Sequence, residues 1–202
     1  ILSLFKKRMD SKFKGEYSGT KNISEKHKID TDNLGDYLSK TLEGFNEVIS
    51  IEEFIGGQSN PTYLISTNEK DLVIRRKPPG KLLKSAHAVD REFKVLTALM
   101  PTEVPTPNTF HLCEDVRIIG TAFYIMEYCD GIIYWDPVAS EVNTERRKGI
   151  FDQLNFGISA LHSQNYKKLG LEDFGKPERW IERQVERWRS QLEGYSSFDA
   201  YN

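Results

Sequence analysis

The hydrophobic periodicity of the chain changes near Asp130 and Gly131, and this change constrains the fold more than any other feature. Before this point, most apolar segments are short and rich in β-branched residues, as in β-strands. After it, apolar residues recur every three or four positions, as on one face of a helix. Strands that are segregated from later helices predict an α+β protein and argue against a doubly wound parallel sheet.

The first part of the chain contains five predicted strands and one helix. The helix covers residues 86–100, where apolar side chains fall at helical spacing, and Pro101 ends it. Because polar turns join consecutive strands, we expect a small five-stranded antiparallel sheet that holds this helix. The predicted strands are residues 48–55, 62–67, 72–77, 109–113 and 122–129.

The second part is predicted to be helical, over residues 144–162 and 177–192. We expect these to be the first helices of an incomplete helical lobe, whose apolar faces lack a full cover. These faces consist of Ile150, Leu154, Ile158 and Leu161 in the first helix and of Ile181, Val185, Trp188 and Leu192 in the second.

The first 30 residues carry eight Lys or Arg side chains against four acids, and few aliphatic residues. This composition predicts a mobile, basic segment. A targeting peptide is the weaker interpretation, because acids interrupt the segment and no initiator Met is present. A short helix is expected from Thr31 to Gly44, with Asp30 or Thr31 as its N-cap. The predicted domains are residues 1–44, 45–129 and 130–202.

Composition excludes several classes of protein. The net charge of -2 gives no reason to expect nucleic acid or a membrane surface as partner. No apolar run approaches the about 20 residues that a membrane-spanning helix needs. Cys113 and Cys129 both lie in apolar segments, which favours reduced core thiols in an intracellular protein.

A glycine-rich turn between the first two predicted strands is the best candidate for ligand binding. Glycines let the backbone approach a ligand, and consecutive amides can cradle phosphate oxygens. It is not a Walker A loop, since no Gly-Lys-Ser/Thr follows. Most such turns are plain hairpins, so further support is needed. The candidate residues are Gly56, Gly57, Gln58, Ser59 and Asn60.

That support comes from a cation on the third strand. Position favours Arg75 as the side chain that reaches phosphates under the turn, and we assign Arg76 and Lys77 to solvent or to the substrate-side rim. Glu92 lies beside the buried stripe of the helix, where an acid is costly unless it is paired. A Glu92–Arg75 ion pair would orient the cation toward phosphate, as in protein kinases.

Glu92 has a second interpretation, as a surface acid that pairs with Arg91 or Lys94 of its own helix. The histidines offer no competing chemistry. We expect His87, His111 and His162 to lack the partners that a catalytic base requires.

Four segments together resemble the aminoglycoside phosphotransferase family. They read Gly-Gly-Gln-Ser-Asn-Pro-Thr-Tyr-Leu, Val-Ile-Arg-Arg-Lys-Pro-Pro-Gly-Lys-Leu-Leu, Ser-Ala-His-Ala-Val-Asp-Arg-Glu-Phe-Lys-Val-Leu and Gly-Thr-Ala-Phe-Tyr-Ile-Met-Glu-Tyr-Cys-Asp-Gly. Within this family, the chain is similar to the kinase-like domain fused to acyl-CoA dehydrogenases, family members ten and eleven. The resemblance covers about residues 45–190 and implies a protein-kinase-like fold.

The resemblance also implies roles for particular residues. Arg75 fills the position of the phosphate-binding strand lysine, and Glu92 that of its helix partner. Glu127, Tyr128 and Cys129 correspond to the hinge that receives adenine. The implied cofactors are ATP and Mg²⁺, and the implied acceptor is a small-molecule hydroxyl such as that of a hydroxyacyl-CoA. A fused dehydrogenase domain with FAD, and a mitochondrial or peroxisomal location, are implied by the same relatives.

The catalytic loop of this family, roughly His-Gly-Asp with a later Asn, is not found in the sequence. We therefore expect no catalytic residue and no metal ligand in this chain, and an inactive fragment. Asp173-Phe174-Gly175 spells the kinase metal motif, but no catalytic loop precedes it, so we reject it. The residues that follow the four histidines are Lys28, Ala88, Leu112 and Ser163.

Three interpretations stay open from the sequence. The chain is part of a phosphotransferase, or a non-catalytic module that binds nucleotide or a partner protein, or a structural domain with a coincidental glycine turn.

Overall fold

The structure is a computed structural model of the chain, and it describes residues 19–43, 45, 47–56, 59–80, 87–175 and 178–196. Two compact units divide the chain, Ile1–Gln164 and Asn165–Asn202. The first unit holds the sheet and four of the described helices, α1 to α4, together with a short 3₁₀ helix at Glu25–His27. The second unit holds α5 (Trp180–Ser196).

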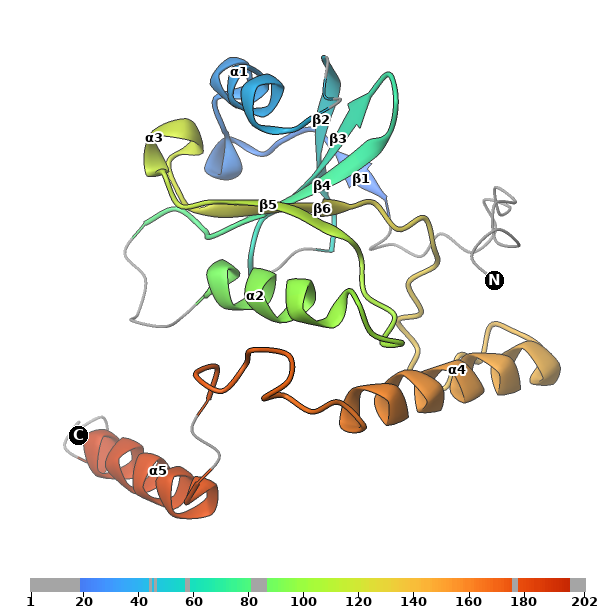
Figure 1. The fold of residues 1–202 in the computed structure, drawn as a ribbon, viewed down its shortest axis with the longest axis vertical. Helices are drawn as coiled ribbons and strands as arrows, with labels where there is room; N and C mark the ends of the chain where they lie inside the picture. Colours follow the sequence, from blue (N-terminus) through green and yellow to red (C-terminus); the bar gives the residue numbers. More distant parts are fainter. Residues whose placement is uncertain are drawn as a thin grey trace, which may run out of the picture. The chain divides into compact units, whose positions relative to one another are not determined.

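The described strands form one antiparallel sheet of six strands, in the order β1-β2-β3-β4-β6-β5 (Figure 1). The α+β class and the antiparallel arrangement are thus confirmed, and each of the five predicted strands is present. The strands are β1 (Thr20–Lys21), β2 (Val48–Phe54), β3 (Thr62–Thr67), β4 (Asp71–Arg76), β5 (Thr109–Cys113) and β6 (Phe123–Glu127).

The predicted strand count of five was wrong, because β1 was missed. Thr20 and Lys21 lie in a polar, basic segment whose sequence shows no alternation. Their strand forms through backbone pairing with the end of β2, where Thr20 lies opposite Phe54. The N–H of Ile55 also donates to the carbonyl of Gly19, at 3.1 Å. Backbone pairing of this kind depends on a neighbouring strand and leaves no side-chain pattern.

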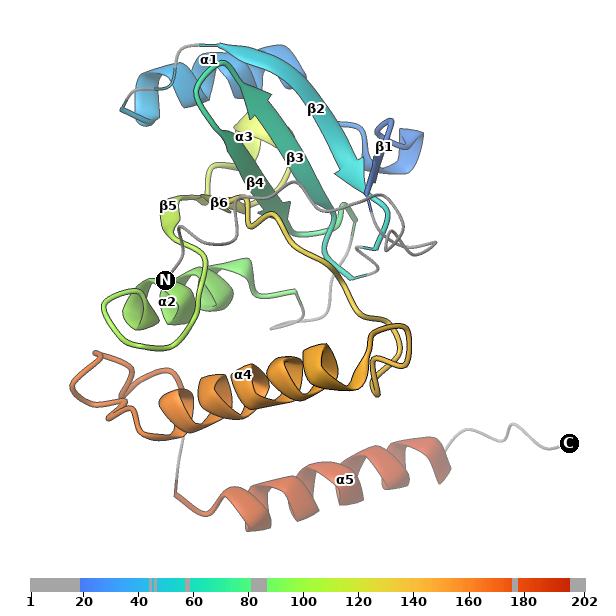
Figure 2. The ribbon, with the colours of Figure 1, turned by 90° about the vertical axis from the view of Figure 1, so that its right-hand side faces the viewer.

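Helices α1 (Thr31–Thr41) and α3 (Val116–Ile119) lie on one face of the sheet, and α2 (Val89–Leu99) lies on the other (Figures 1 and 2). Asp30 caps α1, as expected, by accepting the N–H of Asn33 at 2.9 Å. The short helix α3 lies where the sequence predicted only a polar turn. Its cap is Asp115, whose carboxylate accepts the N–H of Arg117 at 2.9 Å.

The main hydrophobic core lies between the sheet and α1. Leu34 and Leu38 of α1 are fully buried and belong to the same cluster as sheet residues Ile65, Ile74 and Ile125. The predicted boundary at residue 45 stays a prediction, but α1 packs on the sheet that follows it. Gly44, the predicted end of this helix, lies outside the described residues.

Side chains along β4 alternate between the two faces, and this alternation positions the candidate site. Leu72 and Ile74 belong to the core cluster on the α1 side. Val73 and Arg75 therefore point to the opposite face. Helix α2 contacts β5 and β6 on that face.

Helix α4 (Thr144–His162) begins at the N-cap Asn143 and spans the range predicted from the sequence. Its Gly157 faces Pro105, in the connector between α2 and β5. The predicted apolar faces of α4 and α5 are largely exposed, with 53% of Leu154 and 69% of Ile181 accessible. Within the described residues, no helix is both long and apolar enough to cross a membrane.

Candidate functional site

An ion pair between β4 and α2 forms the centre of the candidate site. Nε of Arg75 donates to Oε2 of Glu92 at 2.7 Å, and both side chains are partly exposed, at 30% and 37%. Nη1 of Arg75 donates to the hydroxyl of Thr62 on β3, at 3.2 Å. The pairing expected from the sequence is therefore present, because strand alternation points Arg75 toward α2.

Three side chains from different elements donate to the carboxylate of Glu92. Besides Arg75, Nδ2 of Asn60 donates to Oε1 at 3.1 Å, and the hydroxyl of Tyr124 donates to Oε2 at 3.2 Å. Burial and the nearby charge of Glu92 raise the pKa of Tyr124, so its hydroxyl stays a donor. These bonds fix the carboxylate in one orientation.

Sequence reasoning did not identify Tyr124 or Thr62 as parts of this network. Both lie directly opposite Arg75 on the neighbouring strands, Thr62 on β3 and Tyr124 on β6. A correct strand register would have revealed both residues, because it identifies the side chains directly opposite a candidate cation.

Asn60 belongs to the β2–β3 turn, which we define as residues 55–61, and its side chain points into the protein. The residue is 3% exposed, and its Oδ1 lies 2.7 Å from Nδ1 of His87. Ser59 is exposed and Gly56 is half-buried. Gly57 and Gln58, the other predicted cradle residues, lie outside the described residues. Phosphate binding by this turn stays a prediction.

His87 and His111 are hydrogen-bonded in the structure and not unpaired as expected, although neither has a carboxylate as its partner among the described residues. His87 faces Asn60, and Nε2 of His111 lies 2.7 Å from the hydroxyl of Tyr37 on α1. In both cases the partner comes from a distant part of the sequence, so spacing along the chain could not reveal it.

The assignment of Arg76 to solvent or a rim was also wrong. Arg76 is 2% exposed and points to the face opposite Arg75. Its Nη1 donates to the carbonyl of Ile119 at 3.0 Å, and its Nη2 to that of His27 at 3.1 Å. Lys77, the next cation, is partly exposed, and its Nζ lies 3.5 Å from Oδ1 of Asp90. Arg76 therefore holds the core together and does not serve the site.

The predicted hinge follows β6. The carboxylate of Glu127 accepts Nδ2 of Asn108 at 2.7 Å, and its N–H donates to the carbonyl of Asn108 at 2.8 Å. Tyr128 stacks on Phe54 at the end of β2, with ring centroids 6.3 Å apart. This contact joins the segment after β6 to the strand that leads into the β2–β3 turn. Adenine binding by Glu127 and Cys129 remains a prediction.

The two cysteines differ in environment. Cys113 is buried, as expected of a core thiol, but Cys129 is exposed, so the prediction for Cys129 was wrong. Partial burial of its thiol and the charge of Glu127 raise the pKa of Cys129. The thiol therefore stays protonated near neutral pH and is a weak nucleophile.

Metal ligands are not gathered in the described part of the chain, where no three His, Cys, Asp or Glu side chains lie together. Asp173 and Phe174 form a turn in the second unit, in which the N–H of Phe174 donates to the carbonyl of Leu171 at 3.1 Å.

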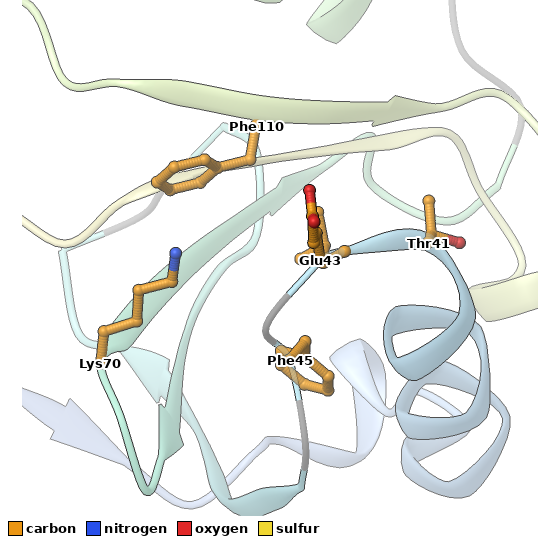
Figure 3. A pocket seen from close by; sticks show the side chains of 6 residues that line it. Thr41, Glu43, Phe45, Lys70 and Phe110 are labelled. Atoms are coloured by element: carbon orange, nitrogen blue, oxygen red, sulfur yellow. The ribbon is translucent and has the colours of Figure 1, made fainter.

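A hollow of about 250 Å³ is lined by Thr41, Leu42, Glu43, Phe45, Lys70 and Phe110 (Figure 3). It lies where the segment after α1 meets the β3–β4 hairpin and the start of β5. Nζ of Lys70 lies 4.4 Å from the ring centroid of Phe110 at its rim. Arg75 is at the far end of β4 from this hairpin and faces α2, so the hollow and the candidate site are separate.

Three features define a kinase-like α+β fold. They are the antiparallel sheet, the helix α2 on the face opposite α1, and the acid–cation pair between α2 and the sheet. A solved structure with this fold, from Ralstonia eutropha and named "putative aminoglycoside phosphotransferase", superposes with a TM-score of 0.71 at 37% identity. The superposition covers 87% of this chain and 50% of that chain. The chain belongs to the phosphotransferase enzyme family, whose sequence profile matches residues 50–200.

The curated relatives are much longer proteins. The Arabidopsis thaliana protein named "Probable acyl-CoA dehydrogenase IBR3" is 44% identical over 84% of this chain, which matches 22% of that protein. Acyl-CoA dehydrogenase family member 10 of Mus musculus is 43% identical over 85% of this chain and 16% of its own length. Family member 11 of Homo sapiens is 34% identical over 90% of this chain and 24% of its own length. The chain thus spans about a fifth of the length of these relatives.

Proposed function

We propose that this chain binds ATP for a phosphotransferase that acts on the hydroxyl group of a small molecule. The observation that carries the proposal is the Arg75–Glu92 pair, formed between the central strand and α2. Such a pair positions a cation against nucleotide phosphates in kinases. Family membership supports phosphoryl transfer as the chemistry.

Arginine in place of the usual lysine suits this arrangement. A lysine must share one nitrogen between its acid partner and phosphate, whereas a guanidinium offers several donors in a planar fork. Here Nε binds Glu92 and Nη1 binds Thr62. Nη2 makes no hydrogen bond within the described residues, and the side chain is 30% exposed. The outer edge of the guanidinium is therefore free to bind phosphate oxygens.

The described residues fit the phosphates of a nucleotide, because they offer an oriented cation beside a glycine-containing turn. Bound ATP would supply the phosphoryl group, with Mg²⁺ as counter-charge. In this proposal Arg75 binds the phosphates and Glu92 orients Arg75. None of the described residues is assigned as the base that acts on the acceptor hydroxyl.

The names of the relatives suggest the acceptor. Since they are named as acyl-CoA dehydrogenases, we infer that the acceptor is a hydroxyacyl-CoA and that a dehydrogenase domain belongs to the same protein. A mitochondrial or peroxisomal location is part of the same proposal. Release of ADP on addition of a hydroxyacyl-CoA, measured with the full-length protein, would separate an enzyme from a non-catalytic nucleotide-binding module.

The binding step is tested by substitution of Arg75. We expect Arg75→Ala to weaken ATP binding at least about tenfold, since a charge-assisted bond is lost, and to leave adenosine binding unchanged. Arg75→Lys should recover part of the affinity. Isothermal titration calorimetry measures both ligands.

Lys40→Ala is the matched control, because Lys40 is an exposed cation on α1, at the opposite face of the sheet. It should bind ATP like the unmodified protein. Equal ATP affinity for Arg75→Ala and the unmodified chain would refute the assignment of Arg75. An unmodified chain that does not bind millimolar ATP would support the purely structural interpretation instead.

A further inference from the structure

Asn60 has both polar atoms of its side chain engaged, although it belongs to the turn that was expected to bind phosphate. Nδ2 lies 3.1 Å from Oε1 of Glu92, and Oδ1 lies 2.7 Å from Nδ1 of His87. The residue is 3% exposed. Because the residue is almost inaccessible to solvent and both ends of the side chain are already bonded to protein groups, Asn60 is poorly placed to contact a ligand.

The chemistry of these partners determines the orientation of the amide. A carboxylate only accepts hydrogen bonds, so the NH₂ group must face Glu92 and the carbonyl oxygen must face His87. Nδ1 of His87 must therefore carry a hydrogen. His87 acts as a donor in this network, whatever the state of its other nitrogen.

Asn60 also closes a ring of hydrogen bonds around Arg75. The backbone carbonyl of Asn60 accepts the hydroxyl of Thr62 at 3.0 Å, and the Thr62 hydroxyl accepts Nη1 of Arg75 at 3.2 Å. Arg75 and Asn60 both donate to Glu92, which completes the ring. The ring joins the β2–β3 turn, β3, β4 and α2 at one point.

The backbone of His87 shows what the bond to Asn60 holds in place. His87 has a φ of 57°, in the left-handed region, and lies two residues before the first residue of α2. Residues other than glycine adopt this conformation at a cost, and it persists where the surroundings hold it. The ring of His87 reaches back to Asn60 and fixes the start of α2 to the turn.

We propose that Asn60 and His87 are positioning residues that fasten α2 to the β2–β3 turn, so that Arg75 is preset for phosphate before a nucleotide arrives. This inference rests on the proposed function and reassigns Asn60 from a phosphate ligand to a support for Glu92. A preorganised site loses less conformational entropy on binding. The contacts of Asn60 and His87 therefore contribute to the part of the ATP affinity that depends on the phosphates.

Two substitutions of His87 distinguish the effect of its side-chain donor from the effect of its backbone conformation. His87→Asn keeps a side-chain donor and tolerates positive φ, whereas His87→Gly tolerates positive φ but removes the donor. We expect His87→Gly to weaken ATP binding about tenfold, as for one lost bond in a charged network, while adenosine binding changes less than about twofold. His87→Asn should bind ATP like the unmodified chain. Asn60→Ala should behave like His87→Gly.

Each result has a definite meaning. Equal weakening of ATP and adenosine binding by His87→Gly, or no weakening at all, would overturn the inference. If Arg75→Ala weakens ATP binding but the His87 and Asn60 variants do not, the inference fails and the proposed function stands. If the unmodified chain does not bind ATP, both fail. Thermal melts of each variant show whether it is folded.

Discussion

At the residue scale, two neighbouring arginines of β4 lie on opposite faces of the sheet and have different partners. Arg75 faces α2 and pairs with Glu92, whereas Arg76 points into the core and donates to two backbone carbonyls. The sequence favoured Arg75 as the ligand-binding cation because of its position, and strand alternation separates it from Arg76. Nothing in the sequence showed that the other arginine would be buried, since its partners are backbone atoms of distant segments.

Glu53 is a second buried charge, and it predicts how stability depends on pH. Its Oε2 accepts the N–H and the hydroxyl of Ser24, each at 2.9 Å, and its Oε1 lies 2.6 Å from Nδ1 of His27. Burial alone would raise the pKa of Glu53, but these hydrogen bonds outweigh burial and lower it. The folded state therefore favours the charged carboxylate.

We expect this carboxylate to stabilise the fold at neutral pH and to lose its effect in acid. Because the folded pKa lies below the unfolded value of about 4.3, the contribution is complete above that pH and falls as the pH drops through the folded pKa. Chemical denaturation of the unmodified chain and of Glu53→Gln, from pH 7 downward, measures the effect. The difference in the free energy of unfolding should be largest near neutrality and narrow in acid. A constant difference would contradict this.

At the scale of elements, the strands and helices with strong periodicity were predicted well. The predicted ranges of β3, β5 and α4 match the structure residue for residue. The three elements that were missed, β1, the 3₁₀ helix at Glu25–His27 and α3, have two, three and four residues. Segments this short have no period to detect, and they form because a neighbouring strand or a capping side chain satisfies their backbone.

The packing of helix α1 on the sheet predicts how substitutions in this helix change the free energy of unfolding. Leu38 is fully buried against the sheet, so Leu38→Ala should lower the free energy of unfolding by about 2–5 kcal/mol. Lys40 is exposed on the same helix, and Lys40→Ala should change it by less than about 0.5 kcal/mol. Urea denaturation followed by circular dichroism measures both. Similar values for the two variants would show that α1 does not pack on the sheet in solution.

The same helix bears on the predicted domain boundary at residue 45. Asn33 of α1 donates to the carbonyls of Arg117 and Ile118 in α3, at 3.0 and 2.9 Å. The predicted domain of residues 1–44 thus contains a helix that is bonded to a distant part of the first unit. Its residues 1–18 lie outside the described part of the chain.

At the scale of the whole molecule, the candidate site lies within the first unit. Asn60, Arg75, His87, Glu92 and Tyr124 all precede Gln164, where this unit ends. Side chains that hold one another through direct hydrogen bonds do not need the second unit for their geometry.

We therefore expect a chain that ends at Gln164 to bind ATP within about twofold of the affinity of the 202-residue chain. Calorimetry of both chains measures this, and the Arg75→Ala substitution in the shorter chain is the control for site-specific binding. Loss of ATP binding by a shorter chain that melts cooperatively would show that the second unit contributes to the site.

The sequence by itself determined the class of fold and most of the elements, and it offered the pairing of Arg75 with Glu92 as one of two interpretations of Glu92. These depend on hydrophobic period, on strand alternation and on a motif that is continuous in the chain. Only the tertiary structure decided the burial of Arg76, the exposure of Cys129, and the partners of Asn60 and His87. The physical reason is that hydrogen bonds between distant segments depend on how strands and helices meet in space, which local sequence does not encode.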